Sequence, residues 1–311
     1  MRTLICGSLA YDTIMVFPDR FARHILPEQT HVLSVCFQVG EMRREWGGCA
    51  GNIAYNLRAL GGEAVVMATL GKDGGAYRDR LQEHGIGIDG IREIDDTFTA
   101  QAFIITDLDD NQITAFHPGA MNHAHVNRVD EVGGIGLGIV SPDGKEGMVS
   151  HTEQFADAGI PFVFDPGQGL PLFSGRELLA MIERASYLTV NDYEAKLLSD
   201  RTGLSLQGLS ERVDALVVTL GGEGSVVHAE GATYMIPAVK PSAIVDPTGC
   251  GDAYRAGLLY GLAQGFDWDR TGKLASVLGS LKIASRGAQN HVVNREIVAA
   301  LYLKAFGERI F

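Results

Sequence analysis

The chain has 311 residues and a formal net charge of −12, with 46% hydrophobic and 21% charged residues. This composition is ordinary for a globular enzyme, and the length allows one large domain or two modest ones. A protein that binds nucleic acid or an anionic membrane surface needs a basic face, which this charge balance does not supply. We therefore expect small-molecule partners, with no nucleic acid and no membrane among them.

The cysteine pattern indicates a reducing compartment. Cys6, Cys36, Cys49 and Cys250 form no C-x-x-C pair and have no histidine cluster beside them. A structural zinc site and a disulfide framework are therefore not expected. The first residues read as a buried strand rather than a signal peptide, and no apolar stretch approaches the roughly 18 residues of a membrane helix. Together these features predict a cytoplasmic protein.

Short apolar runs alternate with helical patterns along the chain. Buried strands are predicted at residues 4–6, 64–70, 162–164, 187–190 and 216–220, and helices at 49–60, 253–262 and 274–283. This alternation predicts an α/β fold with a Rossmann-like, mostly parallel sheet and helices on both of its faces.

Two segments interrupt the alternation with strands of their own. Strands are expected at residues 11–16 and 31–39, and at 99–106 and 113–116 with a turn at 109–111. We expect them to form a small antiparallel β-sheet lid over the carboxyl edge of the main sheet, where ligands of α/β folds bind. The alternative is ordinary decoration of the core. The predicted division is a core of residues 1–9, 46–96 and 118–311, and a lid of residues 10–45 and 97–117.

The segment Asp246-Pro247-Thr248-Gly249-Cys250-Gly251-Asp252 carries the clearest chemical signal. A strand-like stretch at 243–245 precedes it, and a helix is expected to begin at about Asp252. The glycines and the helix N-terminus bring backbone N–H donors and partial positive charge together, which suits a transferring phosphoryl group. Asp252 beside them could accept a proton from an attacking hydroxyl. It could instead be a simple helix cap, but no Walker loop supplies phosphate binding elsewhere.

Four motifs, in the same order over most of the chain, resemble those of the ribokinase-like (PfkB) carbohydrate kinases. They are Gly47-Gly48-Cys49-Ala50-Gly51-Asn52, Asn191-Asp192-Tyr193-Glu194, Thr219-Leu220-Gly221-Gly222-Glu223-Gly224 and the segment from Asp246 to Gly257. The resemblance implies a Rossmann-like core with a β-sheet lid, and a kinase that uses ATP and Mg²⁺.

The resemblance also implies a role for each matching residue. Asp252 is implied as the general base, with Gly249, Cys250 and Gly251 as the anion hole. Ser8, Asp12, Gly47, Gly48 and Asn52 are implied at the substrate, where a carboxylate and an amide suit a cis-diol. Asn191, Thr219, Gly221, Gly222, Gly224, Thr248 and Arg255 are implied at ATP, and Glu194 with Asn191 at magnesium through water. Arg255 could equally be exposed on its helix.

Several phrases resemble the bacterial adenosine kinases of that family more than its ribokinases or fructokinases. They include residues 7–12, 17–21, 26–28, 116–121 and 251–257. The resemblance implies phosphorylation of a nucleoside 5′-hydroxyl, with adenosine to AMP as the first expectation. Phe103 or Phe116 is expected to stack on the purine, and Gln168 is a candidate for reading its edges. The glycines that flank Gln168 depart from the subgroup and leave the base preference open.

Other readings remain open at this point. One is a sugar kinase of the same family acting on ribose or a hexose, and another is a non-catalytic nucleoside-binding regulator on the kinase fold. A dinucleotide-dependent oxidoreductase is disfavoured, because the G-x-G-x-x-G match at residues 85–90 has no strand before it and no helix after it.

Two further expectations concern the surface and the thiols. The exposed edges of a small sheet predict a homodimer through the lid. Cys250 at a helix start predicts a reactive thiol that ATP protects, unless its sulfur is buried and inert.

Overall fold

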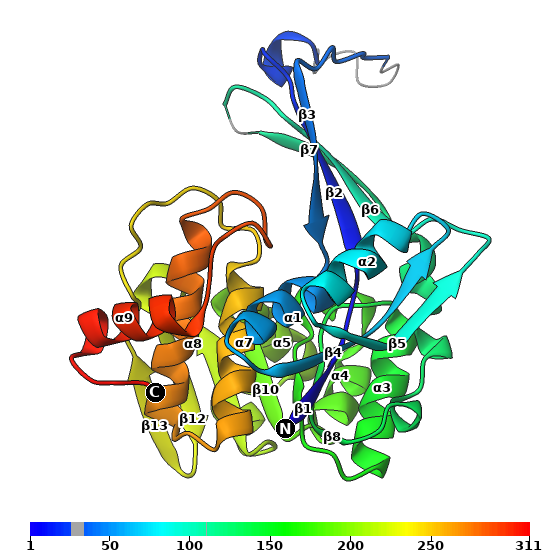
Figure 1. Ribbon diagram of the computed structural model, residues 1–311. Coiled ribbons are helices and arrows are strands. Elements are labelled where there is room, and N and C mark those ends of the chain that lie inside the picture. The colour runs from blue at the N-terminus through cyan, green and yellow to red at the C-terminus, as the bar shows by residue number, and fades with distance from the viewer. Residues whose placement is uncertain (26–33, 110) are drawn as a thin grey trace.

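The computed structural model describes residues 1–25, 34–109 and 111–311. In this described part of the chain, nine strands form one sheet in the order β13-β12-β11-β10-β9-β8-β1-β4-β5 (Figure 1). The strands are β1 (Arg2–Cys6), β4 (Glu63–Gly71), β5 (Gly87–Ile94), β8 (Ile135–Val140), β9 (Phe162–Phe164), β10 (Tyr187–Asn191), β11 (Ala215–Thr219), β12 (Ser225–Ala229) and β13 (Ala232–Ile236). Neighbours from β5 to β11 pair in parallel, and only the pairs β11–β12 and β12–β13 are antiparallel.

Helices cover both faces of this sheet. They are α1 (Cys49–Ala59), α2 (Gly75–Glu83), α3 (Lys145–Asp157), α4 (Gly175–Ile182), α5 (Asp192–Thr202), α6 (Leu206–Ser210), α7 (Cys250–Gln264), α8 (Trp268–Ile283) and α9 (Arg295–Phe306). Ile5 of β1 packs in the apolar cluster of α1, α2, α7, α8 and α9, whereas Leu4 and Cys6 pack in the cluster of α3, α4, α5 and α6. Successive side chains of a strand point to opposite faces, so one strand serves both clusters. The predicted α/β architecture is confirmed.

A second sheet, which we call the small sheet, has the order β3-β2-β6-β7. Its strands are β2 (Ala10–Val16), β3 (Glu41–Gly47), β6 (Ala100–Thr106) and β7 (Gln112–His117). It is mixed rather than antiparallel, because β2 and β6 pair in parallel. β2 follows β1 and β6 follows β5, and both leave the core in the same direction. The chain then returns along β3, antiparallel to β2, and along β7, antiparallel to β6. Figure 1 shows the small sheet standing away from the body of the molecule.

Two local predictions are wrong. No strand forms at residues 34–39; the strand lies at Glu41–Gly47 instead, and residues 26–33 lie outside the described residues, as does residue 110 of the predicted 109–111 turn. The expected strand at 243–245 is irregular, and Ile244 is 80% exposed. Pro241 and Pro247 lie close on either side of this stretch, and a proline cannot donate to a strand ladder.

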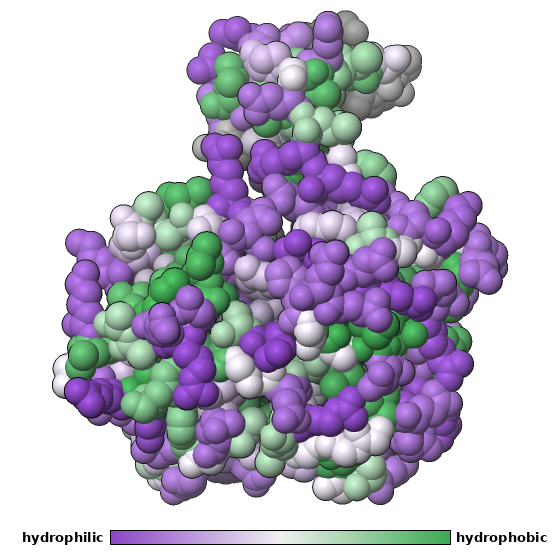
Figure 2. Space-filling model, viewed as in Figure 1, coloured by the Kyte–Doolittle hydropathy of each residue, from purple (hydrophilic) through white to green (hydrophobic). Residues whose placement is uncertain are grey.

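The surface carries mostly hydrophilic residues on the face that Figure 2 shows, over the body as well as the small sheet. Within the described ranges, no helix is both long and apolar enough to cross a bilayer.

Candidate active site

Polar residues follow the carboxyl ends of neighbouring strands of the main sheet. Ser8 comes after β1, Asp143 after β8 and Asp165 directly after β9, while Asn191 and Thr219 end β10 and β11. Because these strands are parallel, their carboxyl ends meet at one edge of the sheet. Two cavities open along that edge.

The larger cavity, of about 1030 Å³, lies between the core and the small sheet. Most of the residues that the sequence predicts for the substrate, the base and the anion hole line it: Ser8, Asp12, Gly48, Asn52, Phe116, Gln168, Gly249, Gly251 and Asp252. Residues predicted at ATP and magnesium line it as well, namely Asn191, Glu194, Thr248 and Arg255. The structure therefore brings together residues from opposite ends of the chain.

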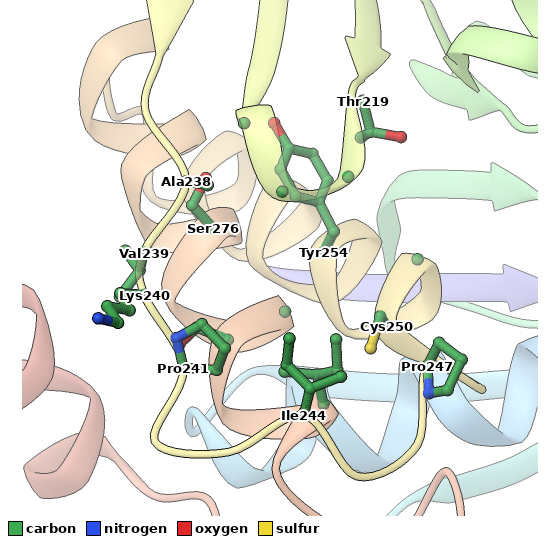
Figure 3. A pocket seen from close by; sticks show the side chains of 17 residues that line it. Thr219, Ala238, Val239, Lys240, Pro241, Ile244, Pro247, Cys250, Tyr254 and Ser276 are labelled. Atoms are coloured by element: carbon green, nitrogen blue, oxygen red, sulfur yellow. The ribbon is translucent and has the colours of Figure 1, made fainter.

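The smaller cavity, of about 550 Å³, lies beside the start of α7. It collects the remaining predicted ATP residues, Thr219, Gly221, Gly222 and Gly224, and Cys250 of the predicted anion hole. Figure 3 shows that the rest of its wall is largely apolar, with Val239, Pro241, Ile244 and Pro247 around the opening. The irregular segment after β13 thus forms one wall of this cavity.

The two cavities meet at the N-terminus of α7, because Pro247 and Gly251 line both of them. The helix begins at Cys250, two residues before the predicted start, and Gly249 caps it with a φ of 79°. A Cβ on Gly249 would also lie 2.7 Å from the Cβ of Ala288, so both the backbone angle and the space require glycine. The first turn of a helix leaves its N–H groups without intrahelical partners. One expected donor is already used, since the Cys250 N–H donates to the Pro247 carbonyl (3.1 Å).

Asp252 lies in the first turn of α7 and faces the larger cavity. Burial raises the pKa of its carboxyl to about 6, against the hydrogen bond from Asn52 and the charge of Arg255, which lower it. Asn52 Nδ2 donates to Asp252 Oδ2 at 2.8 Å. A carboxyl with this pKa is mostly ionised at neutral pH and is a stronger base than an ordinary aspartate.

Arg255, one helical turn further, is buried rather than exposed on its helix. Its Nε and Nη2 donate to the two carboxylate oxygens of Asp165 at 2.9 and 3.0 Å, and Nη2 lies 3.9 Å from Glu194 Oε2. Neighbouring carboxylates raise the pKa of Arg255 although burial lowers it. No motif marked Asp165 as functional, although an aspartate directly after a buried strand is a signal for this sheet edge.

Asn191 and Glu194 form a capping box at the start of α5. The Glu194 N–H donates to Asn191 Oδ1 (2.7 Å), and the Asn191 N–H donates to Glu194 Oε2 (2.8 Å). Burial, and next the charge of Asp165, raise the pKa of Glu194. Among the described residues, no group of three or more His, Cys, Asp or Glu could hold a metal ion by itself. One carboxylate at the cavity nevertheless fits magnesium, which keeps several waters and takes its other ligands from phosphates.

The small sheet contributes Asp12 and Phe116 to the larger cavity. Burial, and next Glu45, raise the pKa of Asp12 to about 6. Ala102 and Ile104 of β6 line the cavity, so Phe103 between them lies on the opposite face of the strand. Of the two candidates for stacking on the purine, Phe103 therefore lies away from the cavity and Phe116 lines it. Gly47 lies at the end of β3 without lining either cavity.

The Cys250 side chain is partly buried, which favours the inert alternative over a reactive thiol. Burial raises its pKa, and the opposing charge of Lys282 is the smaller influence. Lys282 is fully buried, and its Nζ donates to the carbonyls of Asp246 (2.8 Å) and Ser285 (3.1 Å). It thereby ties the turn before α7 to the segment after α8, a role that no sequence motif indicated.

Comparison with known proteins gives the same assignment as the four motifs. Residues 10–295 match the family model described as pfkB family carbohydrate kinase. The chain belongs to this family. It is 31% identical over 257 residues to a nucleoside kinase of Methanocaldococcus jannaschii. The aligned region covers 82% of this chain and 84% of that protein. Two solved structures of Burkholderia thailandensis nucleoside kinase are similar throughout. The inosine complex is 53% identical, with a TM-score of 0.90 and 99% of each chain covered. The complex with ADP-inosine is 55% identical, with a TM-score of 0.88, covering 99% of this chain and 97% of that one.

Proposed function

We propose that this kinase transfers the γ-phosphoryl group of ATP to the 5′-hydroxyl of a nucleoside, with adenosine to AMP as the first expectation and Asp252 as general base. One observation carries the proposal: two cavities meet at Pro247 and Gly251, at the N-terminus of α7. An acceptor in the larger cavity and a nucleotide in the smaller one would therefore face each other across a set of backbone donors.

ATP suits the smaller cavity. The apolar wall formed by Val239, Pro241 and Ile244 fits a purine base, and the glycines after β11 allow close approach of the phosphates. A similar nucleoside kinase has been solved with ADP-inosine, which supports occupation of both cavities at once.

A nucleoside suits the larger cavity better than a free sugar does. Asp12 and Asn52 are acceptor and donor groups for a diol, and Phe116 offers an aromatic face for a base. Gln168 remains the candidate for its polar edge. A pentose alone would leave much of the 1030 Å³ empty. The relative solved with inosine supports a purine nucleoside without selecting adenosine.

In the proposed reaction, Asp252 accepts the proton of the 5′-hydroxyl as the oxygen attacks the γ-phosphorus and ADP leaves. N–H groups in the first turn of α7 stabilise the charge on the transferring oxygens. Magnesium, when bound, neutralises charge on the phosphates. Glu194 and Asn191 would hold it through water. The bidentate contact with Asp165 holds the Arg255 guanidinium in place beside the larger cavity.

The proposal is tested with Asp252→Asn in a magnesium-ATP assay. Loss of a general base costs about 10² to 10⁴ in rate, so we expect kcat to fall by that factor while calorimetry still detects ATP binding. The matched control is Asp267→Asn, which changes the aspartate that caps neighbouring α8. The control keeps its activity. Turnover by Asp252→Asn near that of the unaltered protein would refute the role of Asp252, and no turnover of any nucleoside or sugar by the unaltered protein would favour a non-catalytic regulator.

A further inference from the structure

A buried chain of hydrogen bonds leads from the C-terminal part of the molecule to Asp252. Gln289 is 3% exposed, and its Nε2 donates to Asn52 Oδ1 at 3.0 Å. Asn52 Nδ2 in turn donates to Asp252 Oδ2 at 2.8 Å. No motif marks Gln289, which lies 237 positions beyond Asn52 in the sequence.

Each amide in this chain has one orientation that satisfies its neighbours. Tyr77 Oη donates to the Gly47 carbonyl (2.6 Å), so its oxygen can accept a proton from Gln289 Nε2 (2.7 Å). The other proton of Gln289 Nε2 then faces Asn52, which must turn its oxygen toward Gln289. The Asn52 Nδ2 group is thereby directed to Asp252. An asparagine without such a partner is free to present either end of its amide.

Gly51 leaves the space that this arrangement needs. A Cβ at Gly51 would lie 2.1 Å from the Tyr77 hydroxyl and 2.9 Å from Gln289 Nε2. At the other end, Arg80 Nη2 donates to the Gln289 backbone carbonyl at 3.1 Å and Arg80 Nε lies 3.5 Å from Oε1. These contacts hold Gln289 in place from both sides.

We propose that Gln289 is a positioning residue that orients Asn52 so that an N–H group, rather than an oxygen, faces the base Asp252. The inference rests on the proposed function of Asp252. A donated N–H stabilises the carboxylate and favours its ionised form, whereas a facing amide oxygen would disfavour it. Gln289 thus helps to keep Asp252 ready to accept a proton at neutral pH.

The test compares the pH dependence of kcat/KM in Gln289→Met and Gln289→Glu. Methionine removes the donor at similar length, and a glutamate carboxylate attracts Asn52 Nδ2 and turns its oxygen toward Asp252. In both variants we expect the acidic limb to move to higher pH, by about one unit for one lost hydrogen bond. Titration of the Asp252 carboxyl by carbon-13 NMR should move in the same direction without relying on activity. In an Asn52→Ala background, Gln289→Met should add no further shift.

The matched control is His291→Met. His291 is 2% exposed and its Nε2 lies 2.7 Å from Asn56 Oδ1. Like Gln289, it joins the segment after α8 to α1, but one helical turn beyond Asn52. This control should lose stability without moving the acidic limb. If Gln289→Met does not fold, Tyr77→Phe removes the second acceptor of Gln289, together with the donor to the Gly47 carbonyl. It should give a smaller shift in the same direction.

An unchanged limb in the folded Gln289 and Tyr77 variants, or an equal shift in His291→Met, would overturn the inference. Either result would leave the proposed function standing, provided that Asp252→Asn is inactive. Full activity of Asp252→Asn would instead overturn the proposed function.

Discussion

The buried carboxyl of Asp143 makes the free energy of unfolding depend on pH. It is 3% exposed, Oδ1 accepts from the Gly144 N–H at 2.8 Å, and Oδ2 is a buried atom without a hydrogen-bond partner in the described structure. Burial raises its pKa to about 8. Between the ordinary value of 3.8 and about 8, the folded protein keeps a proton that the unfolded chain has released. The free energy of unfolding therefore falls as pH rises across this range.

We predict that Asp143→Asn removes this loss. The variant should be more stable than the unaltered protein at pH 8, by roughly 5 kcal/mol, with little difference at pH 4. Urea unfolding of the ligand-free protein at both pH values measures it. Asp130→Asn, at an exposed carboxylate, should leave the slope with pH unchanged. Equal slopes in Asp143→Asn and the unaltered protein would contradict the account.

Arg255 donates from Nε and Nη2 to the two carboxylate oxygens of Asp165, and its side chain is 7% exposed. We predict that Arg255→Met lowers the free energy of unfolding by about 3 to 5 kcal/mol, because it leaves a buried carboxylate without its partner. Removing the positive charge should also raise the pKa of Asp252, which Arg255 lowers. Chemical denaturation and the pH profile measure the two effects. Arg128→Met, at an exposed ion pair, is the control and should change neither. A fully stable Arg255→Met would show that the pair is dispensable.

The sequence is informative for residues that carry chemistry within a local motif, and less so for their supports. Asp252, Asn52 and Arg255 stand in recognisable motifs. The residues that support Arg255 and Asn52 do not, and these supports, Asp165 and Gln289, lie 90 and 237 positions away in the sequence. Only the folded sheet edge brings such pairs together. Phe103 illustrates a different difficulty, since a one-residue difference along a strand reverses the face on which a side chain lies.

At the scale of elements, the segment between β13 and α7 forms one wall of the cavity that we propose for ATP. This segment contains no strand. Its Ile244 lines the smaller cavity and is 80% exposed. Long buried strands such as β4 were predictable from their apolar runs, but this segment was not. Its apolar residues have the pattern of a buried strand, which is why the sequence predicts a strand there. In the structure they line a cavity whose other wall is α8, through Ser276 and Gly279, and a local sequence pattern does not reveal that distant helix.

We predict that Ile244→Ser raises the KM for ATP about tenfold with kcat little changed, because the side chain is buried only when a base covers it. Thermal unfolding without ligand should be nearly unaffected, since the side chain is already exposed. Val292→Ser, at a residue that is 75% exposed away from both cavities, is the control. An unchanged KM for ATP would place the base elsewhere.

At the scale of the whole molecule, the small sheet presents two edges, β3 and β7. All residues of β7 are exposed, including Ile113 at 40% and Phe116 at 52%. Figure 2 shows hydrophobic residues among the hydrophilic ones on this projecting part. The sequence could indicate that these strands exist, but their parallel central pair follows from the way both leave the core.

Exposed strand edges are usually paired or covered, so we predict a homodimer through the small sheet. Sedimentation at micromolar concentration should give twice the chain mass of 33.4 kDa. Ile113→Lys on β7 should weaken the dimer, whereas Leu303→Lys on distant α9 should not. A monomer at these concentrations would refute the prediction.

The most direct test of the central claim identifies the product. The unaltered protein is incubated with magnesium-ATP and an equimolar mixture of adenosine, inosine, ribose and fructose, and the phosphorylated species are separated and assigned by phosphorus-31 NMR and mass spectrometry. We predict nucleoside 5′-monophosphates, with AMP foremost, and none with Asp252→Asn. Phosphate found only on a free sugar, or on no acceptor, would contradict it.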